Sequence, residues 1–302
     1  MNMYHSGELA VQRRMGQEAI ATRVGRMIRT EVPAAAAEFL AEQPMIVIAA
    51  ADDDGRVWTS LTAGPPGFVH ADDPRTILLD ALPAPGDPVR DALGSGQQIG
   101  MIAIEPQTRR RMRVNGSAEP AGTGLRIHTD QVYSNCPKYI SRRHIAEVRS
   151  AVGPPDVQRG ESLTDRQQAL IAGADAFFIG SADAAGNADA SHRGGNPGFL
   201  QVLSPRQLRW PDYRGNSMFM TLGNIAANPR CGLLVVDWSS GSTIQLTGTA
   251  EINWDEADSG AGTQCAVDFT IGEVVELTHV SPLRWSSAEL SPANPGPTGD
   301  QG

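Results

Sequence analysis

Short apolar runs separated by turn residues dominate this chain, and they predict β-strands. The clearest runs cover residues 45–51, 100–105, 110–116, 176–183, 232–237 and 243–248. Turn residues flank most of these runs, and the DDDG that follows the first run is an example. Apolar residues at helical spacing are confined mainly to residues 8–15, 17–29 and 34–43. The pattern predicts a mainly β (α+β) fold, a barrel or sandwich with N-terminal helices, rather than a parallel α/β sheet.

Capping signals indicate where helices begin. Pro33 is expected at the first position of the third helix. Asp87, which precedes a proline, is expected to cap a short helix, and Thr164 with Gln167 forms a capping box. Asn224 is expected to cap a further helix that ends at 228–229.

The order of elements recurs along the chain. Residues 45–79 align with residues 176–210 and are identical at 11 of 35 positions, where ordinary residue usage gives roughly two. After a shift of one residue, GMIAIE aligns with GLLVVD, and VNGSAE aligns with LTGTAE. Both copies contain the block GxPGF. The chain is therefore expected to hold two copies of one β unit.

The repeat suggests a division of the chain. We expect N-terminal helices over residues 1–44, a first copy with its connector over 45–160 and a second copy over 161–285. The remaining segment, 286–302, is rich in Pro, Gly and Ser and is expected to be disordered.

Charge and cysteine content exclude several classes of protein. The net charge is −9, and residues 251–302 contribute −8 of it, so a basic nucleic-acid-binding face is not expected. No apolar run is long enough to cross a membrane, and the N-terminus lacks the apolar core of a signal peptide. The three cysteines have no metal-type spacing, so no metal site is expected and a cytoplasmic location fits best.

The second copy carries a candidate site that the first copy lacks. Ser191, His192 and Arg193 precede a glycine-rich segment, and glycines let a ligand approach the backbone closely. The first copy has Ser-Leu-Thr at the equivalent positions. A surface salt bridge beside an exposed histidine is the alternative interpretation.

A second candidate is an anion site at a helix start. Ser217, Met220 and Thr221 come just before the helix that Asn224 is expected to cap. Free N–H groups and hydroxyls at such a start suit a phosphate. Ordinary helix capping would explain the same residues.

Arginines of the first copy form a third candidate. On a strand, Arg109, Arg111 and Arg113 share one face and Arg110 lies on the other. Three cations on one half-buried face require anions. A bound phosphate, acidic residues of the other copy, or a second subunit would each supply them.

The connector holds a fourth candidate. Cys136 lies beside Lys138, which is the only lysine of the chain. A cysteine near cations can be a reactive thiolate. The alternative is a buried cysteine at a junction between a loop and a helix.

These segments together resemble the FMN-binding split-barrel flavoproteins of the pyridoxamine 5′-phosphate oxidase-like family. The resemblance rests on DASHRGGNPGF, GNSMFMTLGNIAANPRCGLLVVDW and STIQLTGTAE of the second copy, and on TRRRMRVNGSAE of the first. YHSGELAVQRR and NCPKYISRR are similar to features of a two-copy bacterial branch. The resemblance implies tandem split β-barrels over most of residues 4–285.

The resemblance also implies a cofactor and its site residues. In this family FMN lies where two barrels meet. For this chain two pairings stay open: the two copies meet within one chain as a pseudo-dimer, or they meet between the chains of a homodimer. By position, the implied cofactor-binding residues are Ser191, His192, Arg193, Met220, Thr221, Asn224, Thr243 and Gln245. Ser217 joins them as a hydroxyl near the expected helix start. The family's phosphate-binding Arg-Lys pair is absent here, so the phosphate charge is expected to meet Arg193, Arg110 or Arg111.

The function implied by the resemblance is an FMN-dependent oxidoreductase that acts on a small molecule, with NAD(P)H as a candidate electron donor. Cys136, Lys138 and His192 are the candidate catalytic residues. Two alternatives remain open. One is a flavin-binding protein without catalysis, and the other is haem binding or degradation, for which His192 would be the key residue.

Overall fold

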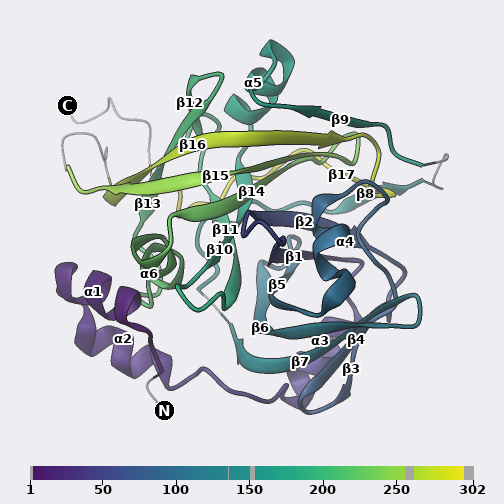
Figure 1. The fold of residues 1–302 in the computed structure, drawn as a ribbon, viewed down its shortest axis with the longest axis horizontal. Helices are drawn as coiled ribbons and strands as arrows, with labels where there is room; N and C mark the ends of the chain where they lie inside the picture. Colours follow the sequence, from purple (N-terminus) through teal and green to yellow (C-terminus); the bar gives the residue numbers. More distant parts are fainter. Residues whose placement is uncertain (1–2, 135, 150–153, 256–261, 296–302) are drawn as a thin grey trace.

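The computed structural model describes residues 3–134, 136–149, 154–255 and 262–295 (Figure 1). Its helices are α1 (Ser6–Arg14), α2 (Glu18–Gly25), α3 (Ala34–Ala41), α4 (Pro88–Ala92), the 3₁₀ turn η1 (Leu93–Ser95), α5 (Asp165–Ala172) and α6 (Met220–Ala227). The strands of the first half are β1 (Met45–Ala51), β2 (Val57–Ala63), β3 (Val69–Asp73), β4 (Thr76–Leu79), β5 (Gln97–Glu105), β6 (Arg110–Ala121), β7 (Gly124–Tyr133) and β8 (Ile145–Val148). Those of the second half are β9 (Val157–Gly160), β10 (Ala176–Ala182), β11 (Ala188–Gly194), β12 (Gln201–Ser204), β13 (Gln207–Tyr213), β14 (Arg230–Asp237), β15 (Ser242–Asn253), β16 (Thr263–Leu277) and β17 (Leu283–Trp285).

The predicted repeat is present as two antiparallel sheets with the same connectivity. The first sheet has the order β2-β1-β5-β6-β7-β4-β3, and the second has the order β11-β10-β14-β15-β16-β13-β12. Each strand of the first sheet thus has a counterpart in the second, and a short helix, α4 or α6, precedes the third strand in the order of each sheet. The prediction of a mainly β chain with two copies of one unit is confirmed.

The block GxPGF has the same physical basis in both copies. A Cβ on Gly64 would lie 2.5 Å from the ring of Phe68, and a Cβ on Gly195 would lie 2.5 Å from the ring of Phe199. The second glycine of the block has a φ of +91° in each copy, a conformation that residues with a Cβ rarely adopt. The two glycines therefore let the chain turn under a buried phenylalanine.

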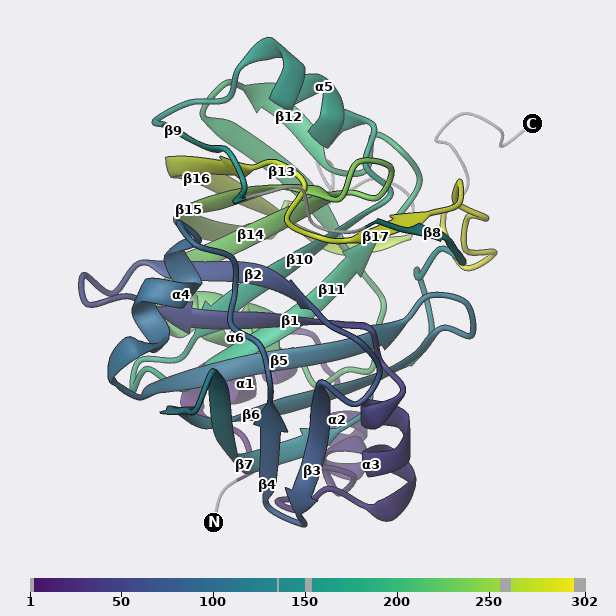
Figure 2. The same cartoon turned by 90° about the vertical axis from the view of Figure 1, so that its right-hand side faces the viewer.

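The two copies pack against each other within one chain. A Cβ on Gly100 of β5 would lie 2.3 Å from the backbone of Asp189, and a Cβ on Gly232 of β14 would lie 2.5 Å from the carbonyl oxygen of Val57. These contacts are reciprocal, because each glycine of one copy meets the second strand of the other. A buried apolar cluster that includes Val47, Phe178 and Leu234 fills the seam. Figure 2 shows β1 and β2 of the first copy lying beside β10 and β11 of the second.

Helix α1 packs on α6 of the second copy. A Cβ on Gly7 would lie 2.2 Å from the carbonyl oxygen of Gly223, so two glycines permit this close approach. Gln12 Nε2 donates a hydrogen bond to the carbonyl oxygen of Met218 at 2.9 Å. The N-terminal segment therefore supports the part of the chain that begins α6.

The predicted helix caps are confirmed in part. Asp87 caps α4, and Thr164 forms the expected capping box of α5. Pro33 is the N-cap of α3 and not its first residue. Asn224 is not a cap, because α6 begins four residues earlier and the N-cap is Phe219.

The connector and the C-terminal residues pair with each other. β8 pairs with β17, and β9 pairs with β16. Part of the segment expected to be disordered also has backbone partners, since Glu289 forms an isolated bridge with Arg142. Residues 296–302 lie outside the described residues. The domain boundaries therefore stay a prediction. Within the described ranges, no helix is long and apolar enough to cross a membrane.

Candidate functional site

A pocket lies on the seam between the two copies, and we call it the seam pocket. Its walls come from β6 and the connector of the first copy, and from β11, β13 and the start of α6 of the second. Its volume is about 130 Å³. Its lining includes Arg111, Arg113, Cys136, Lys138, Tyr139, Ser191, His192, Arg193, Asp212, Tyr213, Ser217, Phe219, Met220 and Thr221.

The start of α6 faces the seam pocket without a capping side chain. Its N-cap, Phe219, is left-handed with a φ of 58° and makes no side-chain cap. The first N–H groups of a helix have no partner within the helix, so they remain available to a ligand. Thr221 Oγ1 donates a hydrogen bond to Ser191 Oγ at 3.0 Å and links the helix to β11. Ser217 instead turns its hydroxyl toward Gln17 Oε1.

Arg111 is a buried cation without an acidic partner. Only 9% of the residue is exposed, its Nη1 donates to the carbonyl oxygen of Arg109 at 3.1 Å, and its Nη2 has no hydrogen-bond partner among the described residues. Burial lowers the pKa of Arg111 to about 10, so the side chain is still charged at neutral pH. An unpaired charge in such a position is costly unless an anion joins it.

The other arginines of the seam pocket have carboxylate partners. Arg113 pairs with Asp189 of the second copy, whose Oδ1 also accepts a hydrogen bond from the hydroxyl of Tyr133 at 3.1 Å. Arg193 Nη2 lies 3.7 Å from Asp212 Oδ1. The pocket therefore holds more positive than negative charge, with Arg111 as its unpaired buried member.

His192 is a neutral imidazole in this environment. Burial lowers the pKa of His192 to about 3, and the nearby Arg111, Arg193 and Arg143 act in the same direction, although Asp175 acts in the opposite one. Its ring packs edge-on against Phe178 at 5.5 Å between centroids. At neutral pH it can donate one hydrogen bond and accept one, but it does not carry a charge.

The connector of the first copy covers one side of the pocket. A Cβ on Gly194 would lie 1.9 Å from the carbonyl oxygen of Tyr139, so the connector lies directly on β11. The rings of Tyr139 and Tyr213 are 5.1 Å apart. Cys136 and Lys138 are exposed at the mouth. The interpretation of Cys136 as a buried cysteine is therefore wrong.

Four of the residues expected at the cofactor do not line the seam pocket. Arg110 is exposed on the other face of β6 and pairs with Glu105 at 3.0 Å. Asn224, Thr243 and Gln245 are buried elsewhere. The prediction that Arg111 and Arg113 share a face opposite to Arg110 agrees with this arrangement. It is wrong for Arg109, because that residue precedes β6 with a positive φ of 61° and does not line the pocket.

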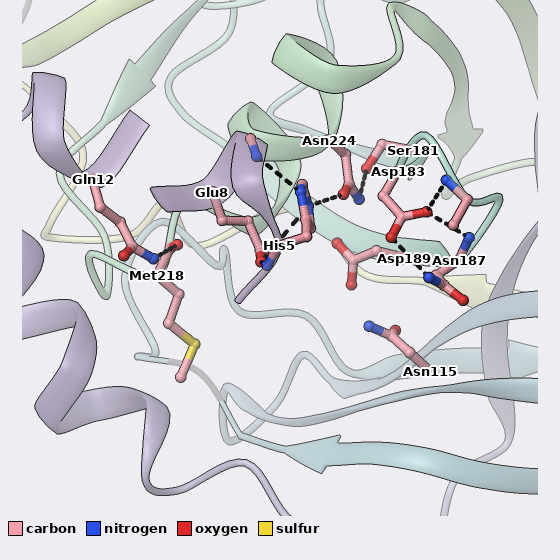
Figure 3. A network of polar contacts seen from close by, with 12 residues as sticks. His5, Glu8, Gln12, Asn115, Ser181, Asp183, Asn187, Asp189, Met218 and Asn224 are labelled. Atoms are coloured by element: carbon pink, nitrogen blue, oxygen red, sulfur yellow. Dashed lines mark hydrogen bonds and ion pairs between the residues drawn. The ribbon is translucent and has the colours of Figure 1, made fainter. Parts of the chain in front are cut away.

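Asn224 belongs to a buried polar network between α1 and α6 (Figure 3). Its Nδ2 donates to Ser181 Oγ at 3.0 Å, and its Oδ1 lies 2.9 Å from His5 Nε2. His5 Nδ1 accepts from the backbone N–H of Gly7, so the ring is the tautomer with its proton on Nε2. Glu8 lies beside this network. Burial raises the pKa of Glu8 to about 8, and the negative charges of Asp189 and Asp183 raise it further.

Some residues of the pocket were not expected from the sequence. Tyr213 and Asp212 lie on β13, and Tyr139 follows Lys138 in the connector. The only sequence signal for these residues was their nearness to segments already singled out. Their grouping depends on the way the two copies meet.

The second half of the chain matches a known family. Residues 163–269 match the family model described as pyridoxamine 5′-phosphate oxidase. The chain carries a domain of this family. The oxidase-family domain includes β11, β13 and α6, which build one wall of the seam pocket. Together with the two sheets of equal strand order, the match confirms the predicted tandem split-barrel class.

Similar solved structures cover about one copy. A HupZ variant of group A Streptococcus is 14% identical, with 38% of this chain and 98% of that chain covered and a TM-score of 0.32. A candidate pyridoxamine 5′-phosphate oxidase from Lactobacillus delbrueckii is 22% identical, with 37% and 93% covered and a TM-score of 0.32. A pyridoxinephosphate oxidase family protein from Clostridium acetobutylicum is 14% identical, with 39% and 89% covered and a TM-score of 0.30. No curated protein matches the chain.

Proposed function

We propose that the seam pocket binds FMN and that the protein is an FMN-dependent oxidoreductase acting on a small molecule. The observation that carries this proposal is the buried guanidinium of Arg111, which has a free Nη2 and no acidic partner in the described chain. The start of α6, which no side chain caps, forms part of the same pocket. Both features call for an anion with several acceptor oxygens, and a phosphate meets that requirement.

The residues of the pocket fit the parts of such a ligand. Arg111 and the first N–H groups of α6 would hold the phosphate. The backbone of β11 at 192–194, together with Arg193, would face the ring. The family's Arg-Lys pair is absent, and Arg111 from the other copy would supply the positive charge in its place.

Bound FMN would supply hydride and electron transfer, which no side chain of the chain can provide. The protein's own contribution would be to position the cofactor, to exclude water under Tyr139 and Tyr213, and to bind substrate at the mouth. Lys138 and Cys136, both exposed there, would meet the substrate. NAD(P)H is the candidate electron donor.

The test compares two arginines of one strand. Arg111→Gln removes the unpaired cation, and we expect FMN affinity to fall by about 1.5–3 kcal/mol, or roughly 10- to 150-fold. Arg110→Gln is the matched control, because Arg110 is an exposed residue outside the pocket. Equilibrium titration followed by flavin fluorescence measures both. Equal affinity in the two variants would remove Arg111 from the site.

The stability of the ligand-free protein separates a binding role from a structural one. Arg111 has no acidic partner, so Arg111→Gln should leave the free energy of unfolding unchanged or raise it. A large loss of stability would make Arg111 a structural residue. A Soret band in the purified protein would favour haem instead of flavin. Reduction of the bound flavin by NADPH, followed by reoxidation by a substrate, would distinguish an enzyme from a carrier.

A further inference from the structure

The repeat creates a second position that is equivalent to the seam pocket, and we call it the second seam. Thr243 and Gln245 of β15 occupy the places in the second copy that Arg111 and Arg113 of β6 occupy in the first. Ser60 of β2 likewise corresponds to Ser191 of β11. The strands β15 and β2 meet across the seam, as β11 and β6 do. Two binding positions per chain are therefore expected from the fold alone.

The second seam is filled by a carboxylate of the chain itself. Asp87 Oδ1 accepts a hydrogen bond from the backbone N–H of Val89 at the start of α4. Asp87 Oδ2 accepts from Gln245 Nε2 at 2.8 Å and from the hydroxyl of Ser60. Asp87 is only 3% exposed, and both Ser60 and Gln245 are fully buried. Asp87 thus takes the position that an anion would occupy at this helix start.

The seam pocket has no carboxylate that caps the start of its helix. No side chain caps α6, and Ser191 pairs with the neutral Thr221 instead of a carboxylate. Asp212, which also lines the pocket, lies beside Arg193. Arg111 therefore keeps a free donor in this pocket, whereas its counterpart in the second seam is the uncharged Thr243.

The two positions also differ in their access to solvent. The loop that carries Asp87 is covered by β9, since a Cβ on Gly86 would lie 2.8 Å from Val157. Arg159 of β9 donates from Nη2 to the carbonyl oxygen of Gly86 at 3.2 Å. At the seam pocket, in contrast, Lys138 is exposed at the mouth.

We propose that the chain binds one phosphorylated ligand per molecule, in the seam pocket alone, because Asp87 fills the corresponding anion position of the second seam. The proposal rests on the proposed function, and it adds the number and the place of the bound molecules. Of the two equivalent positions that the repeat creates, the seam pocket would bind the ligand, and the second seam would have only a structural role.

The test is the stoichiometry of FMN binding to the ligand-free full chain. Titration at protein concentrations well above the dissociation constant, followed by flavin fluorescence and by calorimetry, should reach its end point at one FMN per chain. Arg111→Thr, which gives the seam pocket the residue of the second seam, should lower the affinity at least tenfold. Arg126→Thr, an exposed arginine of β7, is the control and should bind like the unaltered protein.

Each other outcome contradicts a defined part of the reasoning. Two FMN per chain would overturn this inference and leave the proposed function intact. One FMN per chain with unchanged affinity in Arg111→Thr would remove Arg111 from the site and also overturn the inference. No binding of FMN at any concentration tested would overturn the proposed function itself.

Discussion

Replacement of Glu8 by glutamine should make the protein more stable in alkaline solution. Glu8 is 3% exposed, and it lies where α1 meets α6. Its pKa is raised from 4.5 to about 8, mainly by burial and further by Asp189 and Asp183, while a hydrogen bond from the His5 backbone acts in the opposite direction. The folded protein therefore holds a proton on Glu8 between pH 4.5 and 8, where the unfolded chain has none.

The sign and size of the effect follow from this difference in bound protons. Stability falls as pH rises wherever the folded state binds more protons than the unfolded state. At about 1.4 kcal/mol for each pH unit, the window from 4.5 to about 8 corresponds to a loss of about 5 kcal/mol. Glutamine keeps the shape and an acceptor oxygen but does not ionise. The stability of Glu8→Gln relative to the unaltered protein should therefore increase steadily across this window.

Urea unfolding followed by tryptophan fluorescence at several pH values between 5 and 9 measures this difference directly. The matched control is Glu18→Gln, because Glu18 is an exposed glutamate of the neighbouring helix that pairs with Arg13. The reasoning fails if the stability difference between Glu8→Gln and the unaltered protein is the same at every pH. It also fails if Glu18→Gln shows the same trend.

Three further predictions concern a buried ion pair, the thiols and a turn. Arg143→Met should cost about 3–5 kcal/mol of stability in urea unfolding, since it leaves the buried Asp175, 3.0 Å from Arg143 Nη1, without its cation; a cost below 1 kcal/mol would contradict this. An aromatic disulfide reagent should label one thiol per native chain, that of the exposed Cys136, because the other two cysteines are buried and burial raises their pKa; labelling of two or more thiols before unfolding would count against the structure. Gly198→Ala should cost about 1–2 kcal/mol of stability and lower the melting temperature, because its φ of +91° strains any residue with a Cβ. Gly67→Ala should have a similar effect, because Gly67 has the same φ. Gly194 does not test this strain, because it lies in an extended strand.

Local features of the fold were predictable because neighbouring residues decide them. The caps by Asp87 and Thr164 depend on one side chain and an N–H two or three residues away. The turn of GxPGF depends on a glycine at a positive φ in each copy. Strand parity likewise separated Arg110 from Arg111.

The wrong prediction for Asn224 has a physical cause. Asn224 is a typical capping residue, but its amide bonds Ser181 and His5, which are 43 and 219 positions away in the chain. The true N-cap, Phe219, has no capping side chain and so leaves no local signal. Distant partners in a buried network outweighed local preference at this position.

Thr243 and Gln245 illustrate the same limit at the level of the site. The family resemblance placed them on the strand after α6, and hence at the cofactor. In the folded chain, β15 of the second copy meets β2 of the first, so Gln245 bonds Asp87 in the second seam. Because the two copies pack against each other, β6 and β15 each contribute to the site that contains the helix start of the other copy.

The amino-acid sequence by itself determined the strands, the turns and the existence of two related units, because apolar alternation and glycine conformation act over a few residues. Only the tertiary structure decided that the units meet inside one chain, that Arg111 is left without an acid, and that Asp87 closes the equivalent position. These outcomes depend on pairs such as Arg113 with Asp189, 76 positions apart, whose meeting is set by packing across the seam and not by any local preference.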